Sequence, residues 1–316
     1  MNDQGRWWLV LFIKIVLGIA VTVYAVVMVS PSPKPRQAIL WAARRAGGCS
    51  IQETFRSSEF PQTIARIGEE FAARSPVIQE DAGLQLFDTP RGKYWAVKND
   101  KFLRFTLAEQ ELEIYGKGEQ GVRRGDVVLD CGANVGVFTH TALSRGARLV
   151  VAIEPAPVPL ECLRRNFQKE IASGQVIVCP KGVWDHPDTL DLVLGEEGNT
   201  TGNSFVLGRG IKRTVKVPLT TIDNLVQELR LDRVDFIKMD IEGSEKPALR
   251  GAAQTLKRFS PRMAIASEHL PDDDKKIPET VNTLRPGYKI TASSCQDYTF
   301  RVAPEVLLFG AGPVGN

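Results

Sequence analysis

The chain has 316 residues, of which 43% are apolar and 24% are charged, an ordinary composition for a globular protein. The net charge is only +3 and no long basic block occurs, which argues against nucleic acid as the main partner. The five cysteines are scattered without a CxxC pair, a pattern typical of free thiols in a reducing compartment.

Residues 7–29 form an apolar run of 23 residues that contains one charge, Lys14. As a helix the run would be about 34 Å long, enough to cross the roughly 30 Å hydrocarbon core of a bilayer. Its length and the lack of a clear cleavage site favour a transmembrane anchor over a cleaved signal peptide. More basic residues follow the run than precede it, so the positive-inside rule predicts a single-pass membrane protein whose main domain faces the cytoplasm.

The residues after this run divide into a short linker and a region of mixed pattern. The proline-rich stretch 30–36 predicts an extended linker. Within 37–115, residues 60–73 have a helical pattern, whereas 84–100 and 101–107 alternate like short strands. We interpret 37–115 as a small cover region in front of the main domain.

The main domain, 116–316, alternates strands with helices, which predicts an α/β fold with a mostly parallel, Rossmann-like sheet. The strand candidates are 127–130, 149–154, 175–180, 234–240 and 262–267. The helix candidates are 135–145, 157–171, 244–258 and about 274–284. Segment 186–218 interrupts this rhythm and predicts a small antiparallel addition, and 288–290 and 306–309 predict a last pair of strands.

The first strand candidate runs into the sequence DCGANVG at 130–136. In an open parallel sheet, ligands bind at the carboxyl ends of the strands, and glycines there allow backbone to approach a ligand. A dinucleotide loop requires G-x-G-x-x-G, but Asn134 takes the place of the second glycine and Val137 that of the third. Asp130 would repel a pyrophosphate and suit a cationic ligand such as S-adenosylmethionine. We expect ligand contacts from Asp130, Gly132, Ala133, Asn134 and Gly136, although these seven residues alone also fit a simple tight turn.

The next two strands add candidates for nucleoside recognition. Glu154 ends the second strand, where a carboxylate can accept both ribose hydroxyls of an adenosine. After the third strand, Val183 and Trp184 could flank an adenine and Asp185 could bond its amino group. Trp184 fits a packing role equally well.

The fourth and fifth strands carry the candidates for catalysis. Lys238, Asp240 and Glu242 alternate at period two and therefore lean toward one face of the sheet. The alternative is that the acids cap the next helix or that Lys238 neutralises an acid. His269 lies at the carboxyl end of the fifth strand, where it could remove a proton from an acceptor, or serve as an ordinary structural histidine. Asp240 is the other candidate for the base.

The segments VVLDCGANVGVFT, AIEPAP, LTTIDNL and DFIKMDIEGSE occur in this order and resemble the FkbM family of S-adenosylmethionine-dependent methyltransferases. The resemblance covers about 125–284. It implies a seven-stranded class I methyltransferase sheet and O-methylation of a sugar or another small hydroxylated metabolite. It would assign the loop residues Asp130, Gly132, Asn134 and Gly136, with Glu154, to the cofactor, and Asp240 and Glu242 to the catalytic edge.

We therefore predict an S-adenosylmethionine-dependent O-methyltransferase acting on a hydroxyl of a sugar, glycan, lipid-linked compound or other small metabolite. The anchor favours a lipid-linked or surface-glycan acceptor. Two carboxylates are too few to predict a metal. A nucleotide-dependent oxidoreductase shares the sheet and Glu154 but needs the missing glycines. A non-catalytic binding or scaffold protein is the reading if Asp240, Glu242 and His269 do not converge.

Overall fold

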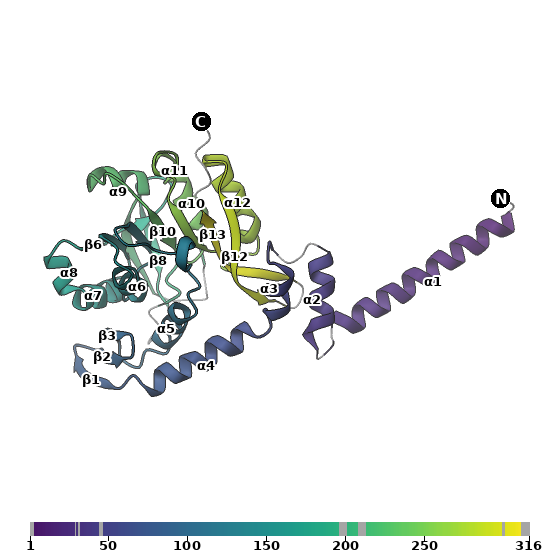
Figure 1. The fold of residues 1–316 in the computed structure, drawn as a ribbon, viewed down its shortest axis with the longest axis horizontal. Helices are drawn as coiled ribbons and strands as arrows, with labels where there is room; N and C mark the ends of the chain where they lie inside the picture. Colours follow the sequence, from purple (N-terminus) through teal and green to yellow (C-terminus); the bar gives the residue numbers. More distant parts are fainter. Residues whose placement is uncertain are drawn as a thin grey trace.

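A seven-stranded mixed sheet forms the centre of the fold in the computed structural model (Figure 1). Its strands, in spatial order, are β12 (Lys289–Asp297), β13 (Val302–Gly310), β11 (Arg262–Ala266), β10 (Phe236–Met239), β4 (Val127–Cys131), β5 (Leu149–Ile153) and β6 (Val176–Cys179). The structure describes residues 3–28, 30, 32–43, 47–195, 201–207, 213–298 and 301–310.

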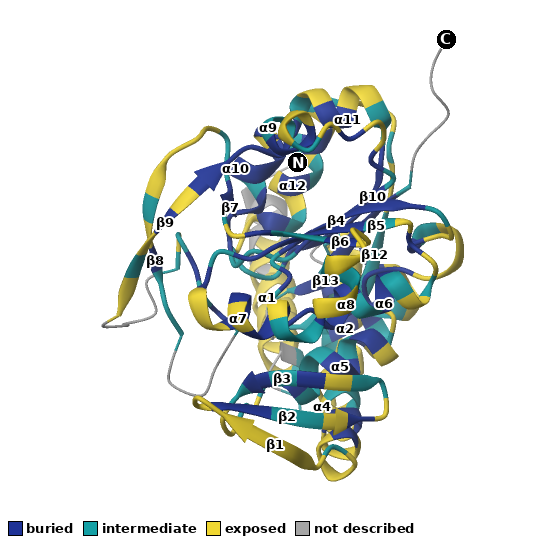
Figure 2. Ribbon diagram, turned by 90° about the vertical axis from the view of Figure 1, so that its left-hand side faces the viewer, coloured by how far each residue is buried: buried dark blue, intermediate teal, exposed yellow. Residues whose placement is uncertain are grey.

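Helices cover both faces of this sheet because its inner strands are apolar on both sides. Val127 and Leu129 of β4 pack against one helix layer, and Val128 packs against the other. The first layer contains α9 (Ile222–Glu228), α10 (Glu245–Arg250), α11 (Ala253–Phe259) and α12 (Asp273–Leu284). The second contains α6 (Val137–Ser144), α7 (Pro157–Asn166) and α8 (Gln168–Ala172). The central strands are accordingly dark blue, that is buried, in Figure 2.

The five strand candidates of the main domain are β4, β5, β6, β10 and β11, and the last pair is β12 and β13. The sheet is mixed rather than mostly parallel. β11, β10, β4, β5 and β6 are parallel, but β13 is antiparallel to both β11 and β12. The cause is the short connection between β12 and β13, since strands joined by a hairpin pair antiparallel.

The addition predicted at 186–218 is a separate three-stranded sheet beside the main one. Its order is β7 (Gly182–Val183), β9 (Thr214–Thr220) and β8 (Thr189–Val193). β8 and β9 are antiparallel, whereas β7 and β9 are parallel. Residues 196–200 and 208–212 of the predicted addition lie outside the described part of the chain.

Two local predictions for the N-terminal part are wrong. The linker expected at 30–36 ends early, because helix α2 (Pro33–Ala42) begins at a proline, whose fixed φ suits the first turn of a helix. Pro31 of that linker is not among the described residues. The strand expected at 101–107 is instead part of α5 (Leu103–Glu111), because the Asp100 carboxylate accepts hydrogen bonds from the amides of Phe102 and Leu103.

The rest of this part packs as a layer over the main domain. It consists of α3 (Ile51–Arg56), α4 (Phe60–Ala73) and the antiparallel sheet of β1 (Val77–Asp81), β2 (Leu84–Thr89) and β3 (Gly92–Val97). The short helix η1 (Gly118–Gln120) follows at the start of the main domain. Tyr94 and Leu107 belong to a core that also contains Val135. The Asn166 side chain joins the backbones of Trp95 and Val135, with bonds of 2.6 to 3.1 Å. The N-terminal part therefore lies directly on the 130–136 loop.

The prediction of a membrane anchor is contradicted. Helix α1 (Asp3–Met28) forms and extends away from the remaining elements (Figure 1). Among the residues described, however, no helix has both the length and the apolar character that a bilayer crossing demands. The prediction of an anchor was based on the length of the apolar run 7–29, and it accepted the charged Lys14 within that run. The predicted single-pass membrane location and the predicted cytoplasmic orientation of the main domain are contradicted as well, because both were derived from the anchor.

The prediction of five free thiols is also wrong. Cys49 and Cys295 form a disulfide that joins the segment before α3 to β12, whereas Cys131, Cys162 and Cys179 are free and buried. The two bonded residues are 246 positions apart, a separation across which no spacing pattern identifies a pair. The cysteines therefore do not indicate a reducing compartment.

Candidate functional site

The loop 130–136 is held by contacts within the protein. Gly132, with φ of +79°, lies so close to β10 that a Cβ would stand 1.9 Å from the carbonyl oxygen of Asp240. Gly136, with φ of +95°, would place a Cβ 2.2 Å from the ring of Phe167. Both glycines are therefore required by packing and by the left-handed backbone. They do not by themselves indicate a ligand.

Asp130 is paired inside the protein. The register of β4 and β10 places it beside Lys238, whose Nζ lies 3.5 Å from Asp130 Oδ1 and donates to the Gly132 carbonyl at 2.8 Å. The Thr139 hydroxyl donates to Asp130 Oδ2 at 2.7 Å. Burial raises the pKa of Asp130, and Lys238 opposes that rise. The cation beside Asp130 is thus Lys238. Asp130 therefore gives no support to the inference of a cationic ligand. The alternative, in which Lys238 neutralises an acid, describes this pair.

A cavity lies at the carboxyl ends of β4, β5 and β10. The described residues that line it include the loop residues Gly132, Ala133 and Asn134, as well as Glu154, Val183, Lys238, Asp240 and Glu242. Glu154 accepts hydrogen bonds from the amides of Asn134 at 2.9 Å and Ala156 at 2.8 Å. Burial raises the pKa of Glu154 to about 7, although these two bonds act to lower it. Glu154 is therefore fixed at the rim between β4 and β5 and faces the cavity.

Trp184 and Asp185 are not brought to this cavity. The Trp184 ring contacts Phe205 edge-on, with 6.3 Å between centroids, which agrees with its alternative packing role. Asp185 pairs with Arg250 at 2.8 Å, and His186 lies 2.6 Å from its other oxygen. Asp130, Gly136 and His269 are likewise absent from the described lining.

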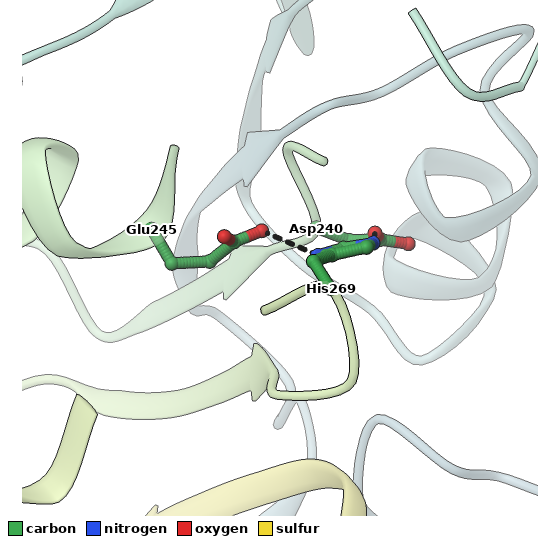
Figure 3. Close-up of side chains that lie close together, drawn as sticks. All are labelled: Asp240, Glu245 and His269. Atoms are coloured by element: carbon green, nitrogen blue, oxygen red, sulfur yellow. Dashed lines mark hydrogen bonds and ion pairs between the residues drawn. The ribbon is translucent and has the colours of Figure 1, made fainter. Parts of the chain in front are cut away.

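His269 lies close to two acids, Glu245 and Asp240 (Figure 3). Its Nδ1 lies 3.0 Å from Glu245 Oε1, and its Nε2 lies 3.5 Å from Asp240 Oδ1. Burial favours the neutral ring, but the hydrogen bond and charge of Glu245, with Glu268 and Asp240, hold the pKa of His269 well above its usual value. An imidazolium has no lone pair with which to remove a proton. This arrangement places His269 to orient Asp240, and the raised pKa makes it a poor candidate for the base.

Asp240 is the point where these groups meet. The Tyr115 hydroxyl donates to its Oδ2 at 2.7 Å, and Lys238 Nζ lies 3.8 Å away. Against the effect of burial, the charges of Lys238 and His269 and the bond from Tyr115 lower the pKa of Asp240. Asp240 is therefore held at the cavity edge by its neighbours, and its lowered pKa makes it a weaker base than an ordinary aspartate.

Asp240, Glu245 and His269 could also be considered as metal ligands, since one donor atom of each lies within 4.8 Å of the others. A histidine with two carboxylates is a ligand set used by transition metals. Ligation requires a neutral imidazole, however, and Glu245 Oε1 already accepts from the amide of Ile241 as well as facing His269. The one positive charge of His269 faces the two carboxylates of the cluster, which keeps a net negative charge.

Comparison with known proteins identifies the family. The family model described as "Methyltransferase FkbM domain" matches residues 130–301. The chain belongs to the FkbM methyltransferase family. This confirms the resemblance seen in the sequence and gives the central sheet its class, an α/β methyltransferase fold with a large mixed sheet.

Several known methyltransferases are similar to this chain at modest identity. The "31-O-demethyl-FK506 methyltransferase FkbM" of Streptomyces tacrolimicus is 29% identical over 206 residues, 57% of this chain and 78% of that protein. The "Hexuronic acid methyltransferase AglP" of Haloferax volcanii is 24% identical over 226 residues, 70% and 85% of the two chains. The crystal structure of "Methyltransferase FkbM" from Methylobacillus flagellatus KT has a TM-score of 0.44 at 18% identity, covering 68% of this chain and 55% of that one.

Three residues of the site escaped the reasoning from sequence. Glu245 stands inside the quoted FkbM-family segment DFIKMDIEGSE, three positions after Glu242, so its motif was visible although its role was not. Tyr115 and Glu109 precede the matched FkbM domain. No pattern marks them, because only the packing of the N-terminal part over the sheet brings them to the cavity.

Proposed function

We propose that the chain is an S-adenosylmethionine-dependent O-methyltransferase acting on a hydroxyl of a sugar, a glycan or another small metabolite. Membership of the FkbM family supports methyl transfer. The activities named for two relatives, a 31-O-demethyl-FK506 methyltransferase and a hexuronic acid methyltransferase, support an oxygen acceptor on a hydroxylated compound. The earlier preference for a lipid-linked acceptor depended on the anchor and is withdrawn with it.

The observation that carries this proposal is the acidic lining of the cavity. Glu109, Glu154, Asp240 and Glu242 all line it, and the cations among the described lining residues are the buried Lys238 and the more exposed Lys181. S-adenosylmethionine carries an ammonium and a sulfonium and no phosphate, so this set of side chains suits it better than it suits a dinucleotide. Glu154, after β5, has the position from which a carboxylate accepts ribose hydroxyls.

Each proposed contact has a definite physical task. The sulfonium of the bound donor supplies an already activated methyl group. Glu154, fixed by two backbone amides, would hold the ribose. Tyr115, Lys238 and His269 would hold Asp240 as an oriented anion at the reacting edge. The N-terminal layer, through Phe102 and Phe105 in the lining, would exclude water and position the acceptor.

Calorimetry on the full chain tests the cofactor. We expect binding of S-adenosylmethionine and S-adenosylhomocysteine, and no comparable binding of NAD. Glu154→Gln should weaken S-adenosylhomocysteine binding. The glutamine side chain has one acceptor oxygen in place of two, so it cannot accept hydrogen bonds from both ribose hydroxyls and from two backbone amides. Asp185→Asn, outside the cavity lining, is the matched control and should bind as the parent does.

The acceptor is tested by mass spectrometry on a panel of sugars, uronic acids and polyhydroxylated compounds. The expected product gains one methyl in place of a hydroxyl hydrogen. Tight NAD binding without any response to the sulfonium compound would instead favour an oxidoreductase. Sulfonium binding without methylation of any acceptor would favour a binding protein.

A further inference from the structure

Methylation of a hydroxyl requires a group that takes the hydroxyl proton as the bond to carbon forms. If the proposed function holds, that group must face the cavity and be unprotonated with appreciable basicity. His269 has a pKa raised by its neighbouring acids, which favours the protonated ring, and it lies outside the described lining. Asp240 faces the cavity, but its lowered pKa makes it a weak base. Lys238 has a raised pKa and is therefore an ammonium, with no lone pair to offer.

Glu109 meets the geometric requirement. It lies on α5, and it lines the cavity next to Phe105 and Thr106 of the same helix. Its side chain is half-buried. Among the described residues, no hydrogen-bond donor or cation is seen in contact with its carboxylate, unlike those of Glu154 and Asp240. A carboxylate in a cavity with accepting capacity left over is available to a hydroxyl of a bound molecule.

The charges around Glu109 come from three other elements. Asp240 and Lys238 face it from β10 and its end, Glu305 from β13, and His269 from the segment after β11. Tyr115 also interacts with it electrostatically, from the segment after α5.

Burial raises the pKa of Glu109 to about 8, with the charge of Asp240 acting in the same direction and that of Lys238 against it. A carboxylate with such a pKa is a far stronger proton acceptor than an ordinary glutamate, whose pKa is about 4.3. It is also still substantially ionised near pH 8, which is the compromise that general base catalysis favours.

We propose that Glu109 is the general base for methyl transfer, contributed by the N-terminal layer rather than by the FkbM domain. A lone pair on the acceptor oxygen forms the new bond to the methyl carbon, and the carbon–sulfur bond breaks with its electron pair returning to sulfur. The proton of the acceptor hydroxyl passes to the Glu109 carboxylate, which becomes a neutral carboxylic acid and later releases the proton to water. Asp240 stays ionised throughout and orients the acceptor.

The test compares Glu109→Gln with Glu111→Gln in the full chain. Glu111 is on the same helix, but its side chain is 53% exposed and pairs with Arg91. Glu109→Gln should lower kcat roughly 10²–10⁴-fold, the usual contribution of a general base, and should remove the rise in kcat/KM with pH centred near 8. Glu109→Gln should still bind S-adenosylhomocysteine, with a loss of affinity far smaller than the loss in kcat, because the other acids of the lining remain. Glu111→Gln should retain both the activity and the pH profile of the parent.

A second measurement does not depend on turnover. Carbon-13 labelling of the glutamate carboxyls allows each to be followed by NMR against pH, and the difference between the parent and Glu109→Gln isolates Glu109. We expect one carboxyl titrating near 8 to disappear. A Glu109 carboxyl that titrates near 4 would overturn the proposal, as would a Glu109→Gln variant with parental kcat and pH profile.

These outcomes are distinct from failure of the proposed function. If the parent chain does not bind S-adenosylhomocysteine, the cofactor assignment is wrong irrespective of Glu109. If it binds and Glu109→Gln is fully active, only the base is wrong.

Discussion

Lys238 is a buried cation whose removal would expose how the site is held together. Its side chain and that of Asp130 are 5% and 0% exposed, and their charged atoms lie 3.5 Å apart. Lys238→Met keeps the volume and removes the charge, so Asp130 is left buried with only the Thr139 hydroxyl as a described donor. Removing one partner of a buried pair costs about 3–5 kcal/mol, and we expect that loss in the free energy of unfolding.

Urea denaturation followed by circular dichroism measures this loss. Lys216→Met is the matched control, because Lys216 and Asp191 form a pair at 73% and 55% exposure, and its loss should be under about 1 kcal/mol. The double variant Lys238→Met/Asp130→Asn removes both charges and should recover much of the stability. A single variant that loses less than about 1 kcal/mol, or a double variant no more stable than the single, would refute the reasoning.

The loss of stability in Lys238→Met should depend on pH. Burial raises the pKa of Asp130, so the folded state binds its proton more readily than the unfolded state does. A group of this kind contributes most stability below its unfolded pKa and loses that contribution as the pH rises through the folded pKa. Without Lys238 the pKa of Asp130 should rise further. The difference in stability between Lys238→Met and the parent should therefore narrow toward acidic pH.

Three other predictions concern stability. Gly136→Ala places a Cβ 2.2 Å from the Phe167 ring at φ of +95° and should cost at least about 1–3 kcal/mol, measured by urea denaturation. Reduction of the Cys49–Cys295 bond, which closes a loop across 246 positions, should cost roughly 2–5 kcal/mol, seen as a lower Tm with reductant in the parent and no change in a Cys49→Ser/Cys295→Ser variant. His269, with its raised pKa, should stabilise the fold fully below about pH 6.5 and progressively less as the pH rises through its folded pKa, and His269→Gln should lack this alkaline decline in urea midpoint.

The main sheet was predictable because its strands are short apolar runs that end in turn residues. Val127 to Asp130 is such a run, and β4 follows it to within one residue. Predictions from local sequence were wrong where one distant contact, or one contact at a helix end, determines the secondary structure or the cysteine pairing. The Asp100 carboxylate accepts a hydrogen bond from the Phe102 amide just before helix α5, in a segment whose pattern alternates. The fold brings Cys49 to Cys295 across 246 positions of sequence.

The candidate site was predictable in outline but not in its pairings. Glu154, Asp240 and Glu242 do line one cavity, as their positions at strand ends suggest. The sequence could not show that Asp130 faces Lys238 instead of a ligand, because that depends on the register between β4 and β10. Nor could it show Tyr115 bonding to Asp240, a contact across 125 positions made by a layer outside the matched domain.

The close approach of Gly132 to the Asp240 carbonyl limits how this site can be engineered. A dinucleotide-type loop grafted between β4 and α6 would pack against the end of β10, which fits the backbone of the present loop closely. Lys238 would also still need the carbonyl of residue 132 as its hydrogen-bond acceptor. The smallest unit that can be exchanged between scaffolds is therefore the loop together with β10 and the turn that follows it. Chimeras cut within that unit should fail to fold, whereas those cut outside it should keep the cavity intact.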